Sequence, residues 1–364
     1  MIPILAWLLV LAVLAALLGA VYQILGTRRD VKLYPPLGRL INLGSHRLHV
    51  LESGRGSPTI LLEAGLMSTV LSWQELQREL ASSFRVVSYD RAGLGWSELG
   101  PMPRTADRIV EELHALLERA GIPPPYILIG HSFGGLTMPL FASRFPDEVA
   151  GMVLVDPVAP AEWNPPSEHD RKLTRIGARV CRRAAILARL GVIRFVAYLL
   201  TTRAKTAAAH LVRLISRGTP DNAGSVSSPW FSALPASEKT MAAVFWVQEK
   251  FALTIASQLE NLPLSAALVS RTGVFCDKKV VILSASSASE QRRNAHAAMA
   301  RRLPVGEHVL TPKSNHWIMQ HELGLVVQAI RSVVEHAEKM SPVPDATVLV
   351  SRQKANAAKS NEVG

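Results

Sequence analysis

Residues Gly130 to Gly134 place a serine where it could act as a nucleophile. The segment reads Gly-His-Ser-Phe-Gly, with a β-rich run before it and a helical pattern after it. A serine on so sharp a strand-to-helix turn needs neighbours without Cβ atoms, because side chains at Gly130 and Gly134 would collide with the adjacent backbone. The turn would expose the Ser132 hydroxyl and would point the N–H of Phe133, at the helix start, toward an oxyanion.

A serine hydroxyl is a weak nucleophile at neutral pH. It needs an imidazole to take its proton and later to protonate the leaving group. The chain has eleven histidines, so residue type alone does not select one.

An alternation of short apolar runs with helical patterns surrounds this turn and predicts an α/β fold with a mostly parallel sheet. A hairpin is expected around Gly44 and Ser45. After Asp156 the alternation stops, and about 115 residues of largely helical composition pass before the next strand at Lys279. That interval is typical of an inserted lid. The expected strands are 39–43, 46–52, 59–62, 85–89, 126–129, 152–155, 279–283 and 307–310, and the expected helices are 71–83, 105–120, 133–145, 288–302 and 322–338.

The first residues predict a membrane-spanning helix. From Ile2 to Leu25 the chain runs 24 residues without a charge, and a helix of that length covers the roughly 30 Å hydrocarbon core. A cleaved signal peptide is the alternative, but a basic region before the apolar run is missing. Arg28, Arg29 and Lys32 follow the span, so the positive-inside bias orients the rest of the chain toward the cytoplasm.

The net charge of +11 is local to one segment. From Arg171 to Arg217 there are twelve Lys or Arg residues and no Asp or Glu, which leaves 28 basic against 29 acidic residues elsewhere. The segment has no nucleic-acid module, so we expect no nucleic-acid partner. Its Arg175, Arg179 and Arg182 recur at helical spacing and suit an anionic membrane surface, although a solvated basic surface is the simpler alternative. The two cysteines, Cys181 and Cys276, have no ligand-like spacing, and we expect neither a metal site nor a cofactor.

The stretch from Thr59 to Pro157 resembles the α/β-hydrolase superfamily, in particular bacterial lipase- or esterase-like members with a helical lid. The resemblance rests on four motifs: Glu63-Ala64-Gly65-Leu66, Tyr89-Asp90-Arg91-Ala92-Gly93-Leu94-Gly95-Trp96-Ser97, the turn at Ser132, and Leu154-Val155-Asp156-Pro157. It implies an eight-stranded, mostly parallel sheet flanked by helices. The expected parts are a transmembrane anchor (1–27), a hydrolase core in two parts (28–157 and 278–340), a helical basic lid (158–277) and a flexible tail (341–364).

The resemblance also implies roles for single residues. His316 lies in the loop before the last helix, where the family carries its catalytic histidine; His321 is the nearest rival. The loop after the seventh strand has no Asp, so the acid is either Asp156, which ends the sixth strand, or Glu290, which could instead cap a helix. Leu66 should supply the second oxyanion N–H, after Phe133. Asp90 and Arg91 are expected to brace the nearby loops by hydrogen bonds.

The expected function is hydrolysis of carboxylic esters with an apolar acyl or lipid-like part, through a Ser-His-Asp/Glu triad and an acyl-enzyme. Apolar residues from Leu190 to Leu200 are expected to line or cover the pocket mouth. Two alternatives remain open: a catalytically silent, membrane-bound interaction protein, and a cofactor-free haloperoxidase or acyltransferase. Oligomeric state and natural substrate are not encoded in any recognisable motif.

Overall fold

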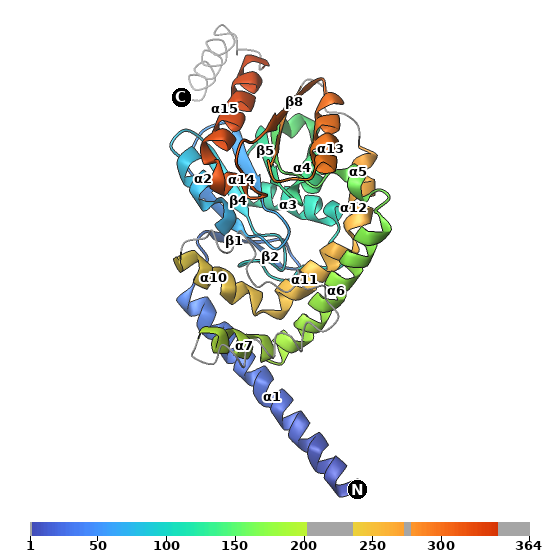
Figure 1. Cartoon of the computed structure of the whole chain (residues 1–364). Helices are drawn as coiled ribbons and strands as arrows, with labels where there is room; N and C mark the ends of the chain where they lie inside the picture. The colour runs from blue at the N-terminus through green and yellow to red at the C-terminus, as the bar shows by residue number, and fades with distance from the viewer. Residues whose placement is uncertain (1, 202–235, 273–277, 341–364) are drawn as a thin grey trace, which may run out of the picture.

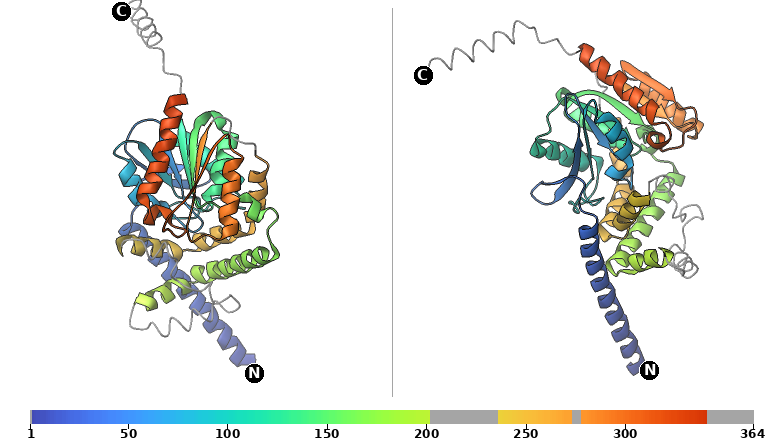
Figure 2. Two further views of the ribbon diagram at one scale, coloured as in Figure 1. Left: turned by 45° about the horizontal axis from the view of Figure 1, so that its top comes forward. Right: turned by 90° about the vertical axis from the view of Figure 1, so that its left-hand side faces the viewer.

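The computed structural model describes residues 2–201, 236–272 and 278–340. It contains an eight-stranded sheet in the order β1-β2-β4-β3-β5-β6-β7-β8, covered by helices on both faces (Figures 1 and 2). The expected tail at 341–364 and the part of the basic segment beyond residue 201 lie outside the described residues.

The strands confirm the predicted mostly parallel sheet. β1 and β2 form the expected antiparallel hairpin and β2 pairs antiparallel with β4, whereas the strands from β4 to β8 run parallel. The strands are β1 (Arg39–Asn42), β2 (Arg47–Ser53), β3 (Thr59–Glu63), β4 (Arg85–Tyr89), β5 (Tyr126–His131), β6 (Val149–Val155), β7 (Lys279–Ser284) and β8 (Val305–Leu310).

Helices cover the two faces of the sheet because its central strands are buried on both sides. In β5, Ile127 and Ile129 belong to the apolar cluster that includes side chains of α2 and α15. Leu128 belongs to the cluster on the opposite face, with side chains of α3, α4 and α13. The core helices are α2 (Gln74–Leu80), preceded by a 3-10 turn (Val70–Trp73), α3 (Ala106–Ala120), α4 (Gly134–Arg144), followed by a second 3-10 turn (Pro146–Glu148), α13 (Glu290–Arg301), α14 (Ile318–His321) and α15 (Leu323–Met340).

The described part of the insertion between β6 and β7 is mostly helical. Its longest pair packs through small residues, since Ala178, Ala185 and Ala188 are the buried side chains of α6, and α6 lies along α11. The larger side chain of Ile176 lies beside Arg175 in an outward-facing hollow. The buried face of α6 is therefore formed by alanines. The helices are α5 (Pro160–Trp163), α6 (Glu168–Arg189), α7 (Val192–Thr201), α10 (Ala236–Trp246), α11 (Glu249–Glu260) and α12 (Leu262–Ser270).

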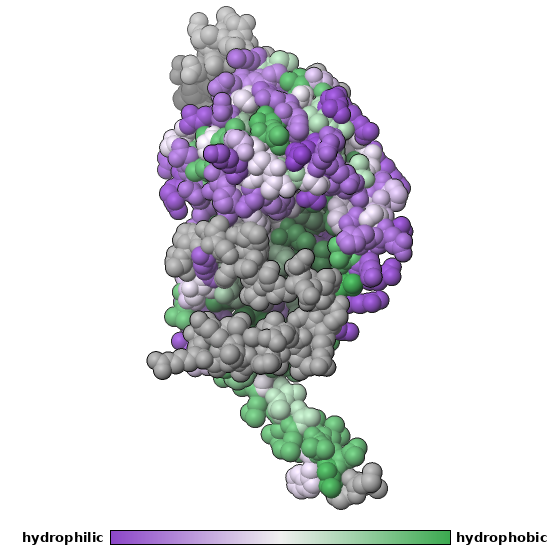
Figure 3. All heavy atoms as spheres, in the orientation of Figure 1, coloured by the Kyte–Doolittle hydropathy of each residue, from purple (hydrophilic) through white to green (hydrophobic). Residues whose placement is uncertain are grey.

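The amino-terminal helix α1 (Ile2–Leu33) is longer than expected. By length and composition it could cross a membrane, although a signal sequence would pass the same test. It continues through Arg28 and Arg29 to Leu33 because its last turns pack on the protein, where Asp30 forms an ion pair with Arg194 of α7. Figure 3 shows apolar side chains gathered on the protruding part of α1, while the core above it presents a mostly polar surface on this face.

Candidate active site

Ser132 lies on a tight turn between β5 and α4. Its φ is 53°, in the left-handed region that non-glycine residues rarely adopt. A Cβ atom on Gly130 would lie 2.6 Å from the carbonyl oxygen of Gly134, and one on Gly134 would lie 3.0 Å from that of Glu63. Close backbone approach therefore requires glycine at position 130 and leaves little room for a side chain at position 134, as the motif predicts. The N–H of Ser132 donates to the carbonyl of Val155, at 3.1 Å, which ties the turn to the end of β6.

Asp156 directly follows β6 and contacts His316. The Nδ1–H of His316 donates to Oδ2 of Asp156 at 2.5 Å, and the backbone N–H of Ala285 donates to Oδ1 at 3.1 Å. The Asp156 side chain is 2% exposed and that of His316 is 36% exposed. Burial alone would raise the pKa of Asp156, but the hydrogen bond and charge of His316 and the N–H of Ala285 hold that pKa below its ordinary value. Asp156 is therefore ionised and fixes the orientation of the His316 imidazole through this hydrogen bond.

The loop that carries His316 is also joined to the turn that carries Ser132. The Nε2–H of His131 donates to the carbonyl oxygen of His316 at 2.9 Å, and the two imidazole rings are 4.7 Å apart between centroids. His131 immediately precedes Ser132, so the candidate base lies beside the candidate nucleophile. Ser132 Oγ and His316 Nε2 are not hydrogen-bonded to each other in the described structure, and such contacts often tighten only when substrate binds.

His131 is a functional neighbour that sequence reasoning missed, because it occupied an unassigned position of the motif. Its ring is fully buried, and burial lowers its pKa to about 3. A carbonyl oxygen can only accept a hydrogen bond, so the ring proton of His131 is on Nε2 and Nδ1 is unprotonated. His131 could have been identified from the sequence by its position at the end of a buried strand, next to the candidate nucleophile.

Leu66 and Phe133 present the two backbone N–H groups expected of an oxyanion hole. Leu66 lies in the loop after β3, beside Met67 with its positive φ of 64°. A Cβ atom on the preceding Gly65 would lie 3.1 Å from Cβ of Ser132, which places this loop against the nucleophile turn. Neither N–H has a hydrogen-bond acceptor among the residues that the structure describes. Two donors on adjoining loops are thus free to bind a developing negative charge.

A buried charge cluster holds the loops that carry these donors. The guanidinium of Arg91 donates to the carboxylate of Glu63, to the carbonyl of Ala64, and to the carbonyl of Gly65 at 2.6 Å. Its carbon Cζ also lies 5.2 Å from the ring centroid of Phe133. One side chain therefore contacts both segments that carry the candidate oxyanion donors.

Glu63 and Tyr89 complete this cluster beneath the oxyanion loop. The hydroxyl of Tyr89 donates to the Glu63 carboxylate, and both side chains are buried. Burial raises the pKa of Glu63, against the opposing charge of Arg91 and the hydrogen bond from Tyr89. In the sequence Glu63 had no role beyond its place in the Glu63-Ala64-Gly65-Leu66 motif; the structure shows it as the counter-charge of Arg91.

Asp90 braces the neighbouring loops as the sequence predicts. Its carboxylate accepts the N–H of Val70 at 2.9 Å, the N–H of Trp96 at 3.2 Å and the Nδ1–H of His49 at 2.9 Å. A Cβ atom on Gly95, whose φ is +50°, would lie 2.2 Å from this carboxylate. The glycine permits the tight turn that folds around Asp90.

Glu290 and His321 lie apart from this constellation. Glu290 is exposed in the first turn of α13, which Ser289 caps, and so has the capping position foreseen as its alternative role. His321 is the exposed last residue of α14. Among the described residues, no cluster of three or more His, Cys, Asp or Glu side chains could hold a metal ion.

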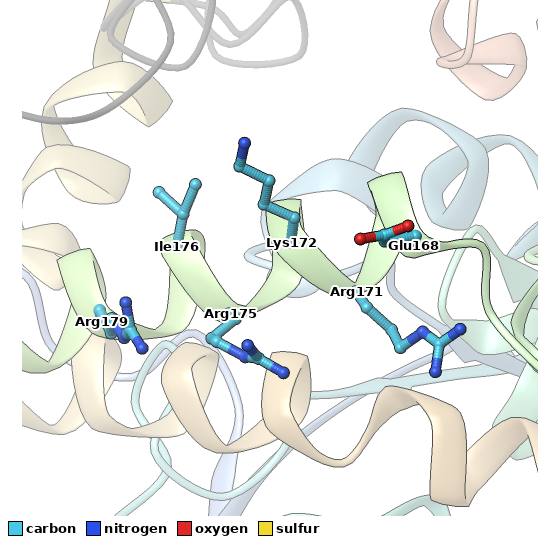
Figure 4. Close-up of a pocket in the computed structure, with 6 residues that line it drawn as sticks. All are labelled: Glu168, Arg171, Lys172, Arg175, Ile176 and Arg179. Atoms are coloured by element: carbon cyan, nitrogen blue, oxygen red, sulfur yellow. The ribbon is translucent and has the colours of Figure 1, made fainter.

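A separate hollow of about 590 Å³ lies on α6, away from the residues just described. Figure 4 shows its lining side chains projecting from successive turns of this one helix. They are Glu168, Arg171, Lys172, Arg175, Ile176 and Arg179. The hollow is strongly basic and contains none of the candidate catalytic residues.

Comparison with known proteins matches residues 58–184 to a family model described as the alpha/beta hydrolase fold. The uncharacterized protein YqjL of Bacillus subtilis is 38% identical over 106 residues, which cover 29% of this chain and 42% of that protein. The chain spans less than half the length of the first four curated relatives that it matches, between 18% and 45%.

Solved structures extend the likeness to most of the chain. A thermophilic esterase from Thermogutta terrifontis is 22% identical with a TM-score of 0.52, over 82% of this chain and 98% of that one. An epoxide hydrolase mutant from Vigna radiata is 19% identical with a TM-score of 0.59, over the same shares of the two chains. These two similarities concern the fold alone. The sheet topology and these structural similarities show that the chain has the α/β-hydrolase fold, and residues 58–184 match the model of that family.

Proposed function

We propose that this protein is a serine hydrolase that cleaves carboxylic esters through Ser132, His316 and Asp156. The contact between His316 Nδ1 and Asp156 Oδ2, at 2.5 Å, carries this proposal, since it leaves Nε2 of the same imidazole as the proton acceptor. That imidazole lies beside His131, the residue before the nucleophile. The structural relatives include an esterase and an epoxide hydrolase, and a serine at the turn favours the esterase chemistry.

In the proposed reaction, Ser132 Oγ attacks the ester carbonyl carbon while His316 Nε2 takes the hydroxyl proton. Asp156 stays ionised and stabilises the imidazolium. The carbonyl oxygen becomes an oxyanion that accepts hydrogen bonds from the N–H groups of Leu66 and Phe133. Collapse of the tetrahedral intermediate expels the alcohol, which takes the proton from His316, and leaves an acyl-enzyme. Water, deprotonated by the same imidazole, then releases the acid and restores Ser132.

An apolar acyl group is the substrate part that the surroundings favour. Leu66 and the neighbouring Met67 pack against an apolar cluster formed by Leu94 of the core and Phe251 and Ile255 of α11. This wall adjoins the proposed oxyanion hole and would exclude water from the acyl side. The backbone of Leu190 and Gly191, at the start of the stretch expected to line or cover the pocket mouth, contacts α1.

A fluorophosphonate probe tests the proposal directly because it labels only an activated serine. We expect labelling of the full chain in membranes, loss of labelling in Ser132→Ala, and retention in Ser332→Ala, which alters an α15 serine that hydrogen-bonds within its own helix. Labelling that persists without Ser132 would contradict the proposal. Absence of labelling in the unaltered chain would favour the silent interaction protein. A series of p-nitrophenyl esters tests the acyl preference: equal turnover of short, medium and long acyl chains would remove support for an apolar site.

The orientation of the catalytic part is proposed to be cytoplasmic, because Arg28, Arg29 and Lys32 follow the apolar segment. External protease added to intact cells should then leave the catalytic part uncut. Cleavage under those conditions would reverse the orientation.

A further inference from the structure

The amino-terminal helix packs on the lid through direct backbone contact. A Cβ atom on Gly19 would lie 2.2 Å from the carbonyl oxygen of Leu190. A Cβ atom on Gly191, whose φ is +72°, would lie 2.4 Å from the carbonyl oxygen of Gly19. Two glycines facing one another let the α6–α7 corner touch the backbone of α1. Any larger residue at Gly19 would push the two elements apart.

Polar contacts next to this junction fix its register. Arg194 of α7 donates to Gln23 at 3.0 Å, to Thr27 at 3.2 Å and to Asp30 at 2.6 Å, all on α1. Gln23 in turn donates to the carbonyl of Val247 at 3.0 Å, and Gln23 and Asp30 are both buried. A segment that is cleaved after export has no need of such partners, and its removal would leave Arg194 without them. These contacts favour a helix that stays attached.

The length of the free part of α1 sets the depth of the lid in the membrane. Residues 2–18 precede Gly19, where the backbone of Leu190 contacts α1, and at 1.5 Å per residue they extend about 26 Å. The described large apolar side chains from Ile4 to Leu18 are mostly exposed. A hydrocarbon core of about 30 Å exceeds that length by two or three residues. If α1 spans the bilayer, the α6–α7 corner must therefore meet the membrane interface, as the protruding helix in Figures 1 and 2 illustrates.

The described part of the lid next to this contact has the composition of an interfacial surface. Ile186 is 62% exposed and Phe195 is 49% exposed, although both are residues that soluble surfaces usually bury. Arg189 and Arg28 line one hollow with Ile24 of α1, and Arg29 is exposed next to Arg28. Each basic side chain near an anionic leaflet contributes roughly 1 kcal/mol. Apolar side chains with basic neighbours are typical of helices that lie in a membrane interface.

We propose that the lid tip, defined as residues 186–198, is immersed in the headgroup and upper acyl region of the bilayer that α1 crosses. The Gly19 contact and the Arg194 bonds hold it at that depth. The occupant of this surface is a phospholipid leaflet, so α1 acts as a structural part of the lid and not only as a tether. This inference does not depend on the reaction proposed above.

Depth-dependent fluorescence quenching tests the proposal on the full chain. Both native cysteines are replaced by serine, and a single cysteine at Phe195, Ile186, Leu9 or Glu335 is labelled with an environment-sensitive fluorophore in vesicles of phosphatidylethanolamine and phosphatidylglycerol. We expect quenching at Phe195 or Ile186 by lipids with a nitroxide near the headgroup, quenching at Leu9 by nitroxides deep in the chains, and none at Glu335 on α15. Quenching at neither lid site would overturn the proposal. A failure at Leu9 would remove its premise and overturn it as well.

A matched pair of substitutions tests whether α1 sets the depth. Gly19→Leu adds a side chain where the lid backbone lies, while Ala15→Leu adds the same side chain to the exposed part of α1. We expect Gly19→Leu to reduce headgroup-level quenching at the lid site and Ala15→Leu to leave it unchanged. Arg194→Ala should act like Gly19→Leu, whereas Arg183→Ala, on an exposed position of α6, should not. Equal quenching in all four variants would refute the coupling.

Discussion

Ser132 and Asp156 lie side by side at the ends of two neighbouring parallel strands, and both have positive φ values, 53° and 41°. They each follow one member of the last register pair of β5 and β6, His131 and Val155. Left-handed backbone at a non-glycine residue costs on the order of 1–3 kcal/mol and persists where the surroundings enforce it. Here it turns two adjacent side chains out of the sheet at one edge, where His316 contacts one of them.

Exchange of the acid for its amide should separate the two carboxylates that the sequence left open. Asp156→Asn keeps the shape but removes the charge that stabilises the His316 imidazolium, and we expect kcat to fall by about 10⁴. Glu290→Gln changes an exposed helix-start carboxylate and should leave kcat within about threefold, at a cost of up to roughly 1 kcal/mol of stability. Steady-state kinetics of both variants on one ester measure the two changes in kcat. The opposite order of the two effects would transfer the acid role to Glu290.

Replacement of Arg91 by lysine should weaken catalysis more than binding. Lysine keeps the positive charge beside Glu63 but cannot reach both Ala64 and Gly65 with a planar fork. The Leu66 loop would then lose its fixed position, and we expect kcat to fall on the order of 10²-fold with KM little changed, as for loss of an oxyanion donor.

Arg144→Lys provides the control for Arg91→Lys, because its ion pair with Asp107 is partly exposed and remote from the site. The phosphonate labelling rate should fall in Arg91→Lys and not in Arg144→Lys. An Arg91→Lys enzyme with unchanged kcat would show that this cluster supports the fold alone.

The sheet and its order of elements could be predicted because they rest on local patterns. Alternating apolar runs and helical periods gave all eight strands within a few residues. Gly130 and Gly134 indicated the nucleophile turn, because the lack of room for Cβ atoms is a local property of one short segment. Asp156 could be named as a candidate only because the family places acids there.

What the sequence did not reveal depends on contacts between distant segments. Arg91 with Glu63, and Arg194 with Asp30, join residues 28 and 164 positions apart, and no periodic pattern encodes such a pairing. α1 continues past the expected anchor (1–27), through Arg28 and Arg29, to Leu33. Their helix continues since Asp30 has a partner on the lid, which only the fold supplies.

Alanine at Gly65 should damage the site more than the fold. Its Cβ atom would lie 2.9 Å from Nδ1 of His131 and 3.1 Å from Cβ of Ser132, so the loop or the nucleophile turn must shift. We expect loss of most activity and a stability cost of about 1–3 kcal/mol. Gly324→Ala, where no atom lies within 4 Å of the added Cβ, should change neither. Ester turnover and thermal unfolding measure both effects; wild-type turnover in Gly65→Ala would contradict the packing of this loop against Ser132.

Acid should destabilise the protein partly through His131. Burial lowers the pKa of this residue to about 3 in the folded state, against 6.5 when unfolded. Between those pH values the unfolded chain binds more protons than the folded protein at this residue. The contribution of neutral, buried His131 to the free energy of unfolding is therefore fully present above pH 6.5. It falls by about 1.4 kcal/mol per pH unit as the pH drops below that value. His131→Gln keeps a side-chain N–H for the carbonyl of His316 and removes the titration. The free energy of unfolding in detergent at pH 7, 6 and 5 should therefore fall less steeply in His131→Gln than in the unaltered chain, while exposed His321→Gln should match the latter. Parallel slopes for all three proteins would mean that His131 is not held neutral by the fold.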